Sequence, residues 1–289
     1  MNYIFFYKGD VKKHIYESIN SILSVDKSAY IYFCSDKTIK SSSSRFNLID
    51  IKDIQSDLVN EIDKIEKFEQ LDNNPLWETS LLRVFYLYEV AKALGIEKFI
   101  HFDNDVVLYE PYENLKDNFD DSKINITRLT NDMLIFGYCF IGNIEVYKNV
   151  CESLIEIYQN KSDYEQKYFS GKSMVEMRSL HVSYLKNPEY FNILNSIPNA
   201  NSSFVFDPLS FGQFLGGRHY KRFSKGYLDK LHLTYELMKN NELNPKYKNG
   251  IASVSYRGIN NNLANLHVHS KKLSKFKPIS YENYFQSAK

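Results

Sequence analysis

The sequence predicts an α/β fold in which helices flank a Rossmann-like sheet that is mixed but mainly parallel. Two observations predict it: short apolar runs alternate with a segment of helical periodicity near the start of the chain, and an acidic triplet follows a later apolar run directly. This order of elements is typical of a parallel sheet. The length of 289 residues suits one large domain. Residues 1–289 are therefore interpreted as a single domain.

The first fifty residues supply the start of the sheet. The run YIFFY at 3–7 is apolar throughout and predicts a buried strand. Residues 11–23 place four aliphatic side chains at helical spacing. Apolar runs at 29–34 and 46–51 then predict two further strands.

A long helix and another strand lead to the acidic triplet. Residues 76–94 follow Pro75 and repeat apolar side chains at intervals of three and four. They end at Gly95, as expected of a helix with a C-terminal glycine cap. Residues 98–102 (KFIHF) predict the next strand, and the triplet DND stands at its carboxyl end.

The rest of the chain gives shorter patterns. We expect strands at 106–108, 133–141, 204–206, 251–256 and 266–270, helices at 144–158, 173–185 and 227–238, and a polar loop at 161–172.

Asp103 and Asp105 form the acidic pair of the triplet. In an open α/β sheet, ligands bind outside the carboxyl ends of the strands, and the Asp-x-Asp spacing lets both carboxylates converge on one cation. Mg²⁺ and Mn²⁺ prefer such oxygen ligands and leave positions open for phosphate oxygens. The alternative is a solvated acidic turn, which the apolar runs on both sides of the triplet disfavour.

The segment WETSLLRVFYLYEVAKALGIEKFIHFDNDVVLYEPY, within 76–112, resembles the core of GT-A glycosyltransferases, especially family 8 and its bacterial relatives. In that family a helix that bears an arginine leads into a strand that ends in Asp-x-Asp. The resemblance assigns Arg83 to the donor site and the acidic pair to the metal. It implies a GT-A domain with a nucleotide-binding part at about 1–110, and an acceptor-binding part and C-terminal closing segment at about 111–289.

Two late histidines are candidates to complete the metal site. His267 and His269 lie two residues apart in an expected strand, so their side chains face the same side. The segment NLHVHSKK is similar to the His-x-x-Gly-x-x-Lys segment of family 8, although Ser270 stands at the glycine position. The resemblance implies that His267, with His269 as second choice, binds the metal and that Lys271 or Lys272 meets the donor phosphates. The alternative is a histidine packed on a core strand.

Two further acids are candidates for contact with substrate. Asp207 precedes three glycines in VFDPLSFGQFLGG, and glycine lets backbone approach a ligand closely. Asp207 is therefore a candidate to bind hydroxyl groups or to act as a base, and the alternative is a helix N-cap before Pro208. Glu176, in SMVEMRSL, is similar to an Asp-Met pair of the relatives, which implies contact with the donor or acceptor sugar.

The nucleotide is expected across the first strands. Phe6 and Tyr7 end the first strand and Asp36 follows the second, at the edge where nucleotides bind in such sheets. Trp77, at the start of the long helix, is interpreted either as a core residue or as a ring that stacks on a sugar.

Charge is distributed unevenly along the chain. The net charge is +1, but the residues from Arg218 onward hold 14 Lys and Arg against 4 Asp and Glu. This basic part is expected to face an anionic partner, namely the donor diphosphate, a lipid-linked acceptor or a membrane surface, unless it is only a solvated face. Nucleic acid is not expected, because the sequence shows no basic helix or binding motif of that class.

The three cysteines, Cys34, Cys139 and Cys151, lack ligand spacing and are interpreted as buried free thiols of a reducing compartment. The N-terminal run MNYIFFYKGD reaches charged residues too early for a signal peptide. We therefore expect a cytoplasmic protein, or one that is peripheral at the inner face of the membrane.

The predicted function is a metal-dependent glycosyltransferase that uses Mn²⁺ or Mg²⁺. It would move a sugar from a nucleoside-diphosphate sugar, with UDP as first choice, to a saccharide or lipid-linked acceptor in bacterial surface polysaccharide synthesis. One alternative is a nucleotidyltransferase acting on sugar phosphates, although only Lys8-Gly9-Asp10 stands where its glycine- and basic-rich loop is expected. The other is a non-catalytic sugar-binding protein, which the intact acidic pair disfavours.

Overall fold

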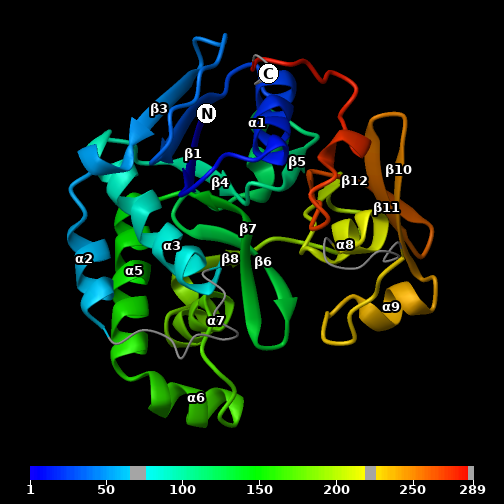
Figure 1. The fold of residues 1–289 in the computed structure, drawn as a ribbon. Helices are drawn as coiled ribbons and strands as arrows, with labels where there is room; N and C mark the ends of the chain where they lie inside the picture. Colours follow the sequence, from blue (N-terminus) through cyan, green and yellow to red (C-terminus); the bar gives the residue numbers. More distant parts are fainter. Residues whose placement is uncertain (66–75, 219–225, 286–289) are drawn as a thin grey trace.

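The computed structural model describes residues 1–65, 76–218 and 226–285 (Figure 1). At its centre is a seven-stranded sheet with the order β3-β2-β1-β4-β7-β6-β8. The strands are β1 (Asn2–Tyr7), β2 (Tyr30–Ser35), β3 (Phe46–Asp50), β4 (Phe99–Phe102), β6 (Ile124–Thr130), β7 (Met133–Ile141) and β8 (Phe191–Ile193). Among them only β7 runs antiparallel to its neighbours. The expected fold class, an α/β fold with a mixed and mainly parallel sheet, is confirmed.

The sheet is buried on both faces, as the unbroken apolar run of β1 requires. Ile4 and Phe6 point into one core cluster, and Tyr3 and Phe5 point into another on the opposite face. The first face is covered by α2 (Asp57–Lys64), α3 (Leu76–Ala93), α5 (Ile144–Gln159) and α7 (Glu176–Lys186) (Figure 1). The second face is covered in part by α1 (Lys13–Val25).

The helix α3 ends as the sequence predicts. Gly95 has a φ of +63°, and the amide of Ile96 donates to the carbonyl of Ala91 at 2.8 Å. The left-handed glycine turns the chain toward β4 without the steric cost of a Cβ atom. Pro75, expected before this helix, lies outside the described residues.

The C-terminal half of the chain adds a four-stranded sheet beside the central one (Figure 1). It contains β9 (Phe204–Val205), β10 (Leu243–Lys248), β11 (Ile251–Tyr256) and β12 (Ile259–Leu263), with α8 (Ser210–Gly216) and α9 (Tyr235–Lys239) close by. The helices α4 (Tyr112–Leu115) and α6 (Lys161–Phe169) complete the described α-helices.

A short two-stranded ladder joins the two regions. Strand β13 (Asn265–His267) pairs antiparallel with β5 (Val106–Leu108), and His267 lies opposite Val106. The ladder brings a late segment of the chain directly against the acidic triplet that precedes β5.

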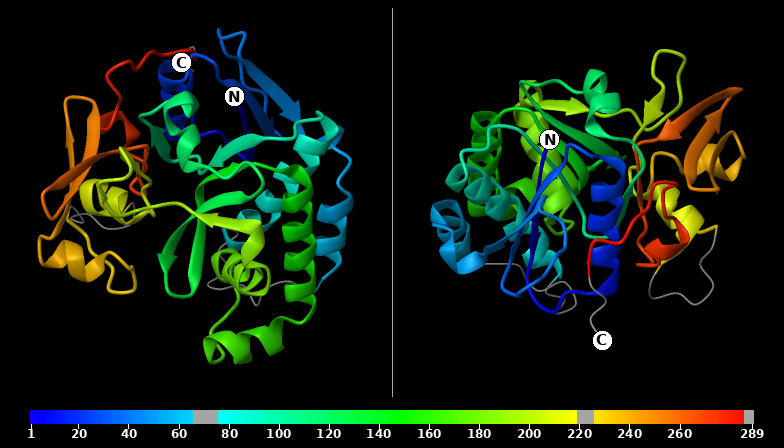
Figure 2. Two further views of the ribbon diagram at one scale, coloured as in Figure 1. Left: turned by 180° about the vertical axis from the view of Figure 1, so that it is seen from behind. Right: turned by 90° about the horizontal axis from the view of Figure 1, so that it is seen from above.

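The segment after this ladder runs back along α1 toward the first residues (Figure 2). The amide of Tyr284 donates to the side chain of Asn20 at 2.9 Å, and Ser42 donates to the carbonyl of Tyr284 at 2.9 Å. Leu273, Phe276 and Phe285 are buried. The basic tail is therefore anchored at its far end.

Three segments have another type or another length in the structure than the sequence predicts. The polar segment at 161–172 is helical over Lys161–Phe169, and periodicity missed it because only Phe169 is buried there. The helix expected at 227–238 is limited to Tyr235–Lys239, because Asp229 accepts a hydrogen bond from the amide of Leu231 and forms a turn. The strand expected at 266–270 ends at His267.

The expectation of buried free thiols is confirmed for Cys34, Cys139 and Cys151, and burial raises the pKa of Cys34 to about 12. Among the described helices, none combines the length and the apolar character that crossing a membrane requires.

Candidate functional site

The acidic triplet is held between three strands. The amide of Asp103 donates to the carbonyl of Gly137 on β7 at 3.1 Å, and the amide of Val106 donates back to the carbonyl of Asp103 at 3.1 Å. Asn104 donates its side-chain amide to the carbonyl of Phe6 on β1 at 3.3 Å. The triplet therefore forms a tight turn at the carboxyl ends of β1 and β4, where ligands bind in such sheets.

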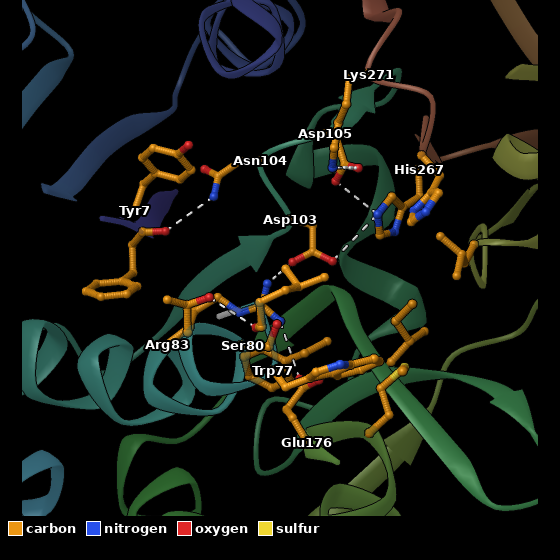
Figure 3. A pocket seen from close by; sticks show the side chains of 18 of the residues that line it. Tyr7, Trp77, Ser80, Arg83, Asp103, Asn104, Asp105, Glu176, His267 and Lys271 are labelled. Atoms are coloured by element: carbon orange, nitrogen blue, oxygen red, sulfur yellow. Dashed lines mark hydrogen bonds and ion pairs between the residues drawn. The ribbon is translucent and has the colours of Figure 1, made fainter. Parts of the chain in front are cut away.

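Three possible ligand atoms converge beside this turn (Figure 3). Oδ1 of Asp105 lies 3.0 Å from Nε2 of His267, and Oδ2 of Asp103 lies 3.6 Å from the same nitrogen. The other carboxylate oxygen of each acid accepts a hydrogen bond from a basic side chain. Arg83 donates to Asp103, and Lys271 donates to Asp105. Each acid therefore turns one oxygen toward His267.

His269 extends the cluster, since one ligand atom each of Asp105, His267 and His269 lies within 4.8 Å of the other two. Adjacent ligands of an octahedral ion with bonds of about 2.1 Å stand about 3 Å apart, which matches the contact between Asp105 and His267. Carboxylates suit Mg²⁺ and Mn²⁺, and imidazole favours the transition metal. The residues present fit a divalent cation.

Burial removes water from the charged groups of this cluster and so affects the pKa of Asp105. Asp105 is 3 % exposed and His267 is 5 % exposed. Burial alone would raise the pKa of Asp105, but the charges and hydrogen bonds of His267 and Lys271 outweigh it and hold that pKa well below its usual range. Asp105 is therefore a carboxylate, ready to bind a cation.

Arg83 joins the cluster to a second acid. Its guanidinium donates to Asp103 and, at 3.3 Å through Nη2, to Oε1 of Glu176, the first residue of α7. Glu176 is 5 % exposed, and its burial raises its pKa against the opposing charge of Arg83. Sequence reasoning selected all three residues, but not this bridge.

A glycine of β7 makes room for the histidine. A Cβ atom on Gly137 would stand 2.7 Å from Nδ1 and 3.2 Å from Cε1 of His267. This glycine was not predicted to matter, although a lone glycine inside the apolar run MLIFGYCFI signals a close approach.

Asp207 lies behind His267. Its carboxylate accepts from the amides of His267 at 2.9 Å, Phe211 at 3.0 Å and Gly212 at 2.9 Å. Burial raises the pKa of Asp207 to about 6 against these bonds. The structure therefore shows Asp207 tying α8 to β13. Its role toward a substrate hydroxyl or as a base stays a prediction.

Gly212, one of the glycines after Asp207, lies directly against the protein backbone. A Cβ atom on Gly212 would stand 1.9 Å from the carbonyl oxygen of His267. This glycine therefore lets α8 contact the backbone of β13. Contact of these glycines with a ligand stays a prediction. The N-cap expectation is corrected in detail, since α8 begins at Ser210 after Leu209, although Asp207 does bind amides of its first turn.

These residues surround a pocket of about 420 Å³ (Figure 3), a size in the range of small-molecule sites. Of the twelve residues selected from the sequence, the lining includes Phe6, Tyr7, Arg83, Asp103, Asp105, Glu176, His267, His269 and Lys271. The lining does not include Asp36, Lys272 or Asp207. Asp36 instead accepts from the amide of Gly9 at 2.7 Å, where it fixes the loop that follows β1.

Further lining residues were not selected from the sequence. His14, in the first turn of α1, is half-buried, and its burial together with Lys271 lowers its pKa to about 4. Ile135, Met177 and Leu209 form an apolar wall. Nothing in their local sequence distinguishes them from ordinary core residues.

No protein-family model and no curated protein sequence matches the chain. Among solved structures, it is similar to mouse xyloside xylosyltransferase 1 in its apo form, at 11 % identity over 68 % of this chain and 85 % of that one, with a TM-score of 0.44. It is similar to the galactosyltransferase LgtC in complex with donor and acceptor sugar analogues, at 9 % identity over 78 % and 82 %, with a TM-score of 0.44.

A third similar structure is the glycosyltransferase GlyE of Streptococcus pneumoniae TIGR4, at 13 % identity over 68 % of this chain, with a TM-score of 0.41. The match spans 45 % of GlyE. All three are glycosyltransferases, the class that the sequence resemblance names. Because every TM-score is below 0.5, we base the function on the geometry of the site and not on these likenesses.

Proposed function

We propose that this chain is a metal-dependent glycosyltransferase that takes its sugar from a nucleoside-diphosphate sugar, with UDP as the nucleotide. The observation that carries the proposal is the convergence of Asp105, His267 and His269 at the edge of a pocket beside the carboxyl end of β1. These residues come from two segments far apart in the chain, and Asp103 adds a carboxylate oxygen 3.6 Å from Nε2 of His267. The acceptor would be a saccharide or a lipid-linked saccharide of a bacterial surface polysaccharide.

The surrounding side chains suit a diphosphate leaving group. A divalent cation at the cluster would neutralise part of the charge that develops as the bond to the sugar breaks. Arg83 and Lys271 hold the outer oxygens of the two acids, so the inner oxygens stay directed at one point. Lys8 also lines the pocket and would place a further positive charge near the phosphates.

The test begins with binding. Titration of UDP in the presence and absence of Mn²⁺ is expected to show that the metal is required. Asp105→Asn, which keeps the shape and removes the charge, is expected to weaken Mn²⁺-dependent UDP binding at least about tenfold. Asp121→Asn is the matched control, because Asp121 is exposed and pairs with Lys98 away from the pocket.

Two incubations with Mn²⁺ then separate the alternatives, one with a panel of sugar nucleotides and one with a nucleoside triphosphate and a sugar phosphate. Release of a nucleoside diphosphate supports a glycosyltransferase. Release of pyrophosphate from a nucleoside triphosphate and a sugar phosphate would instead identify a nucleotidyltransferase, and tight sugar binding with no turnover would identify a binding protein. Equal UDP affinity of Asp105→Asn and the natural chain would refute the metal site.

A further inference from the structure

The pocket has two chemically different parts. The part around Asp105 and His267 is charged, whereas Trp77, Ile135, Met177 and Leu209 give the other part an apolar wall. In Figure 3, Tyr7 lies to one side of Asp103, while Trp77 and Glu176 lie together on another side of it.

This layout would hold a nucleotide sugar in one orientation in the pocket. A diphosphate at the metal cluster, with its nucleoside toward Tyr7 at the end of β1, directs the sugar toward Trp77 and Glu176. The sugar would then contact the apolar wall. Thr79, Ser80 and Glu176 also line the pocket and supply polar groups for some of its hydroxyls.

Leu209 shows that the apolar wall is maintained against a backbone cost. Its φ is +82°, a region that favours glycine. Asp207 holds this turn through the amides of Phe211 and Gly212. A glycine would fit the backbone without strain, yet a leucine stands there, 9 % exposed, and packs with Ile135 and Met177. Strain of this kind persists chiefly at functional sites.

On the basis of the proposed function, we propose that the apolar wall selects a donor whose sugar carries a methyl group. A hexose hydroxyl placed against Leu209 and Met177 would lose its hydrogen bonds to water without replacement. A methyl group gains from the same burial. Two kinds of sugar present one, a 6-deoxyhexose and an N-acetylhexosamine, and Leu209 is the specificity-determining residue for either.

The chain contains an intrinsic fluorophore that can measure donor binding. Trp77 is the single tryptophan of the chain, and it lines the apolar part of the pocket. Its fluorescence, followed at fixed Mn²⁺ concentration, gives the affinities of UDP, UDP-glucose, UDP-6-deoxyglucose and UDP-N-acetylglucosamine without any need for turnover.

We expect one of the two methyl-bearing donors to bind at least about tenfold more tightly than UDP-glucose, and the donor that does so identifies the kind of sugar. Leu209→Gly, which keeps the backbone conformation and removes the side chain, is expected to abolish this preference. Met177→Gln, of similar length but polar, is a second variant should Leu209→Gly fold poorly. Leu231→Gly, at a leucine that is 69 % exposed, is the matched control.

UDP-glucose binding as tightly as both methyl-bearing donors would overturn the inference and leave the proposed function standing. A preference that survives in both Leu209→Gly and Met177→Gln would also overturn it. If neither UDP nor any of the donors binds with Mn²⁺, the proposed function and the inference fail together.

Discussion

Arg83 joins two acidic side chains that lie on different elements. Its guanidinium contacts Asp103 at the end of β4 and Glu176 at the start of α7. A planar fork of donors can serve two carboxylates at once, whereas an ammonium group is a single point charge. The residue therefore positions Asp103 and stabilises a buried glutamate at the same time.

Arg83→Lys is accordingly expected to lower Mn²⁺-dependent nucleotide affinity by roughly 10- to 100-fold, with the fold retained. Calorimetric titration of UDP with Mn²⁺ measures the effect. Arg178→Lys is a matched control, because the Arg178 side chain is 14 % exposed against 12 % for Arg83 and bonds to Asp132 and Ser173 outside the metal cluster. Full affinity in Arg83→Lys would show that the bridge is dispensable.

The two histidines differ in position. Nε2 of His267 faces both acids, while His269 follows the end of β13 and is less buried. We expect His267→Ala to weaken Mn²⁺-dependent UDP binding at least about tenfold more than His269→Ala does. His181→Ala, at a histidine of α7 outside the cluster, is the control. Equal and negligible effects of the first two variants would mean that the segment LHVHS is only a core strand.

Sequence reasoning selected the residues of the acidic and histidine cluster, but not the contacts between them. Asp103, Asp105 and His267 follow recognisable patterns, because a ligand type at a strand end is visible in one stretch of sequence. The bridge from Arg83 to Glu176 and the contact of Lys271 with Asp105 join residues far apart in the chain, and such pairs depend on the tertiary fold.

At the scale of elements, β7 determines where the His267 ring can lie. A Cβ atom on Gly137 would stand 2.7 Å from Nδ1 of this ring, closer than real Cβ contacts. Gly137→Ala should therefore displace the imidazole from Asp105 and lower Mn²⁺-dependent UDP affinity by about tenfold or more.

A double-mutant cycle distinguishes this mechanism from general damage to the sheet. In the His267→Ala background the ring is absent, so Gly137→Ala should have little further effect on binding. Titration of the four proteins, with thermal unfolding recorded alongside, measures the coupling. A full loss of affinity from Gly137→Ala in the His267→Ala background would show that the glycine acts elsewhere.

The second sheet illustrates what periodicity cannot predict. Strands β10 (LNPKYK) and β12 (INNNL) are polar, and neither was expected from the sequence. Their backbone pairing with β11 and β9 stabilises them, while few of their side chains enter a core. In the central sheet, β1, β4 and β7 were predictable because each is a buried apolar run. The strands β6 (INITRLT) and β8 (FNI) of the same sheet were not expected, because one is interrupted by polar residues and the other is only three residues long.

For the whole molecule, the C-terminal segment links the site to α1. Lys271 contacts Asp105, and the chain then continues past the exposed Lys272 and Lys275 to its anchor at Asn20. If metal and diphosphate bind at the cluster, they lie next to the start of this segment and restrain it.

We therefore expect Mn²⁺ with UDP to slow tryptic cleavage after the lysines of 271–275 several-fold, because cleavage requires local opening of the chain. Mass spectrometry of early digests identifies the cleavage sites. Lys239, exposed on α9 and outside the pocket lining, provides an internal reference whose cleavage should not change. Unaltered cleavage at both places, under conditions where UDP is bound, would rule out closure of this segment over the site.

The pairing of β5 with β13 also determines when the site can form. These strands lie about 160 residues apart, and closing so long a loop costs entropy before any contact compensates for it. The strands β1 to β4, with α1 and α3, are complete in the chain long before His267 has been synthesised. On the ribosome, the growing protein would thus carry a folded sheet edge with its two acids but without their histidines. The proposed metal site would therefore be completed only after the histidines have been added to the chain.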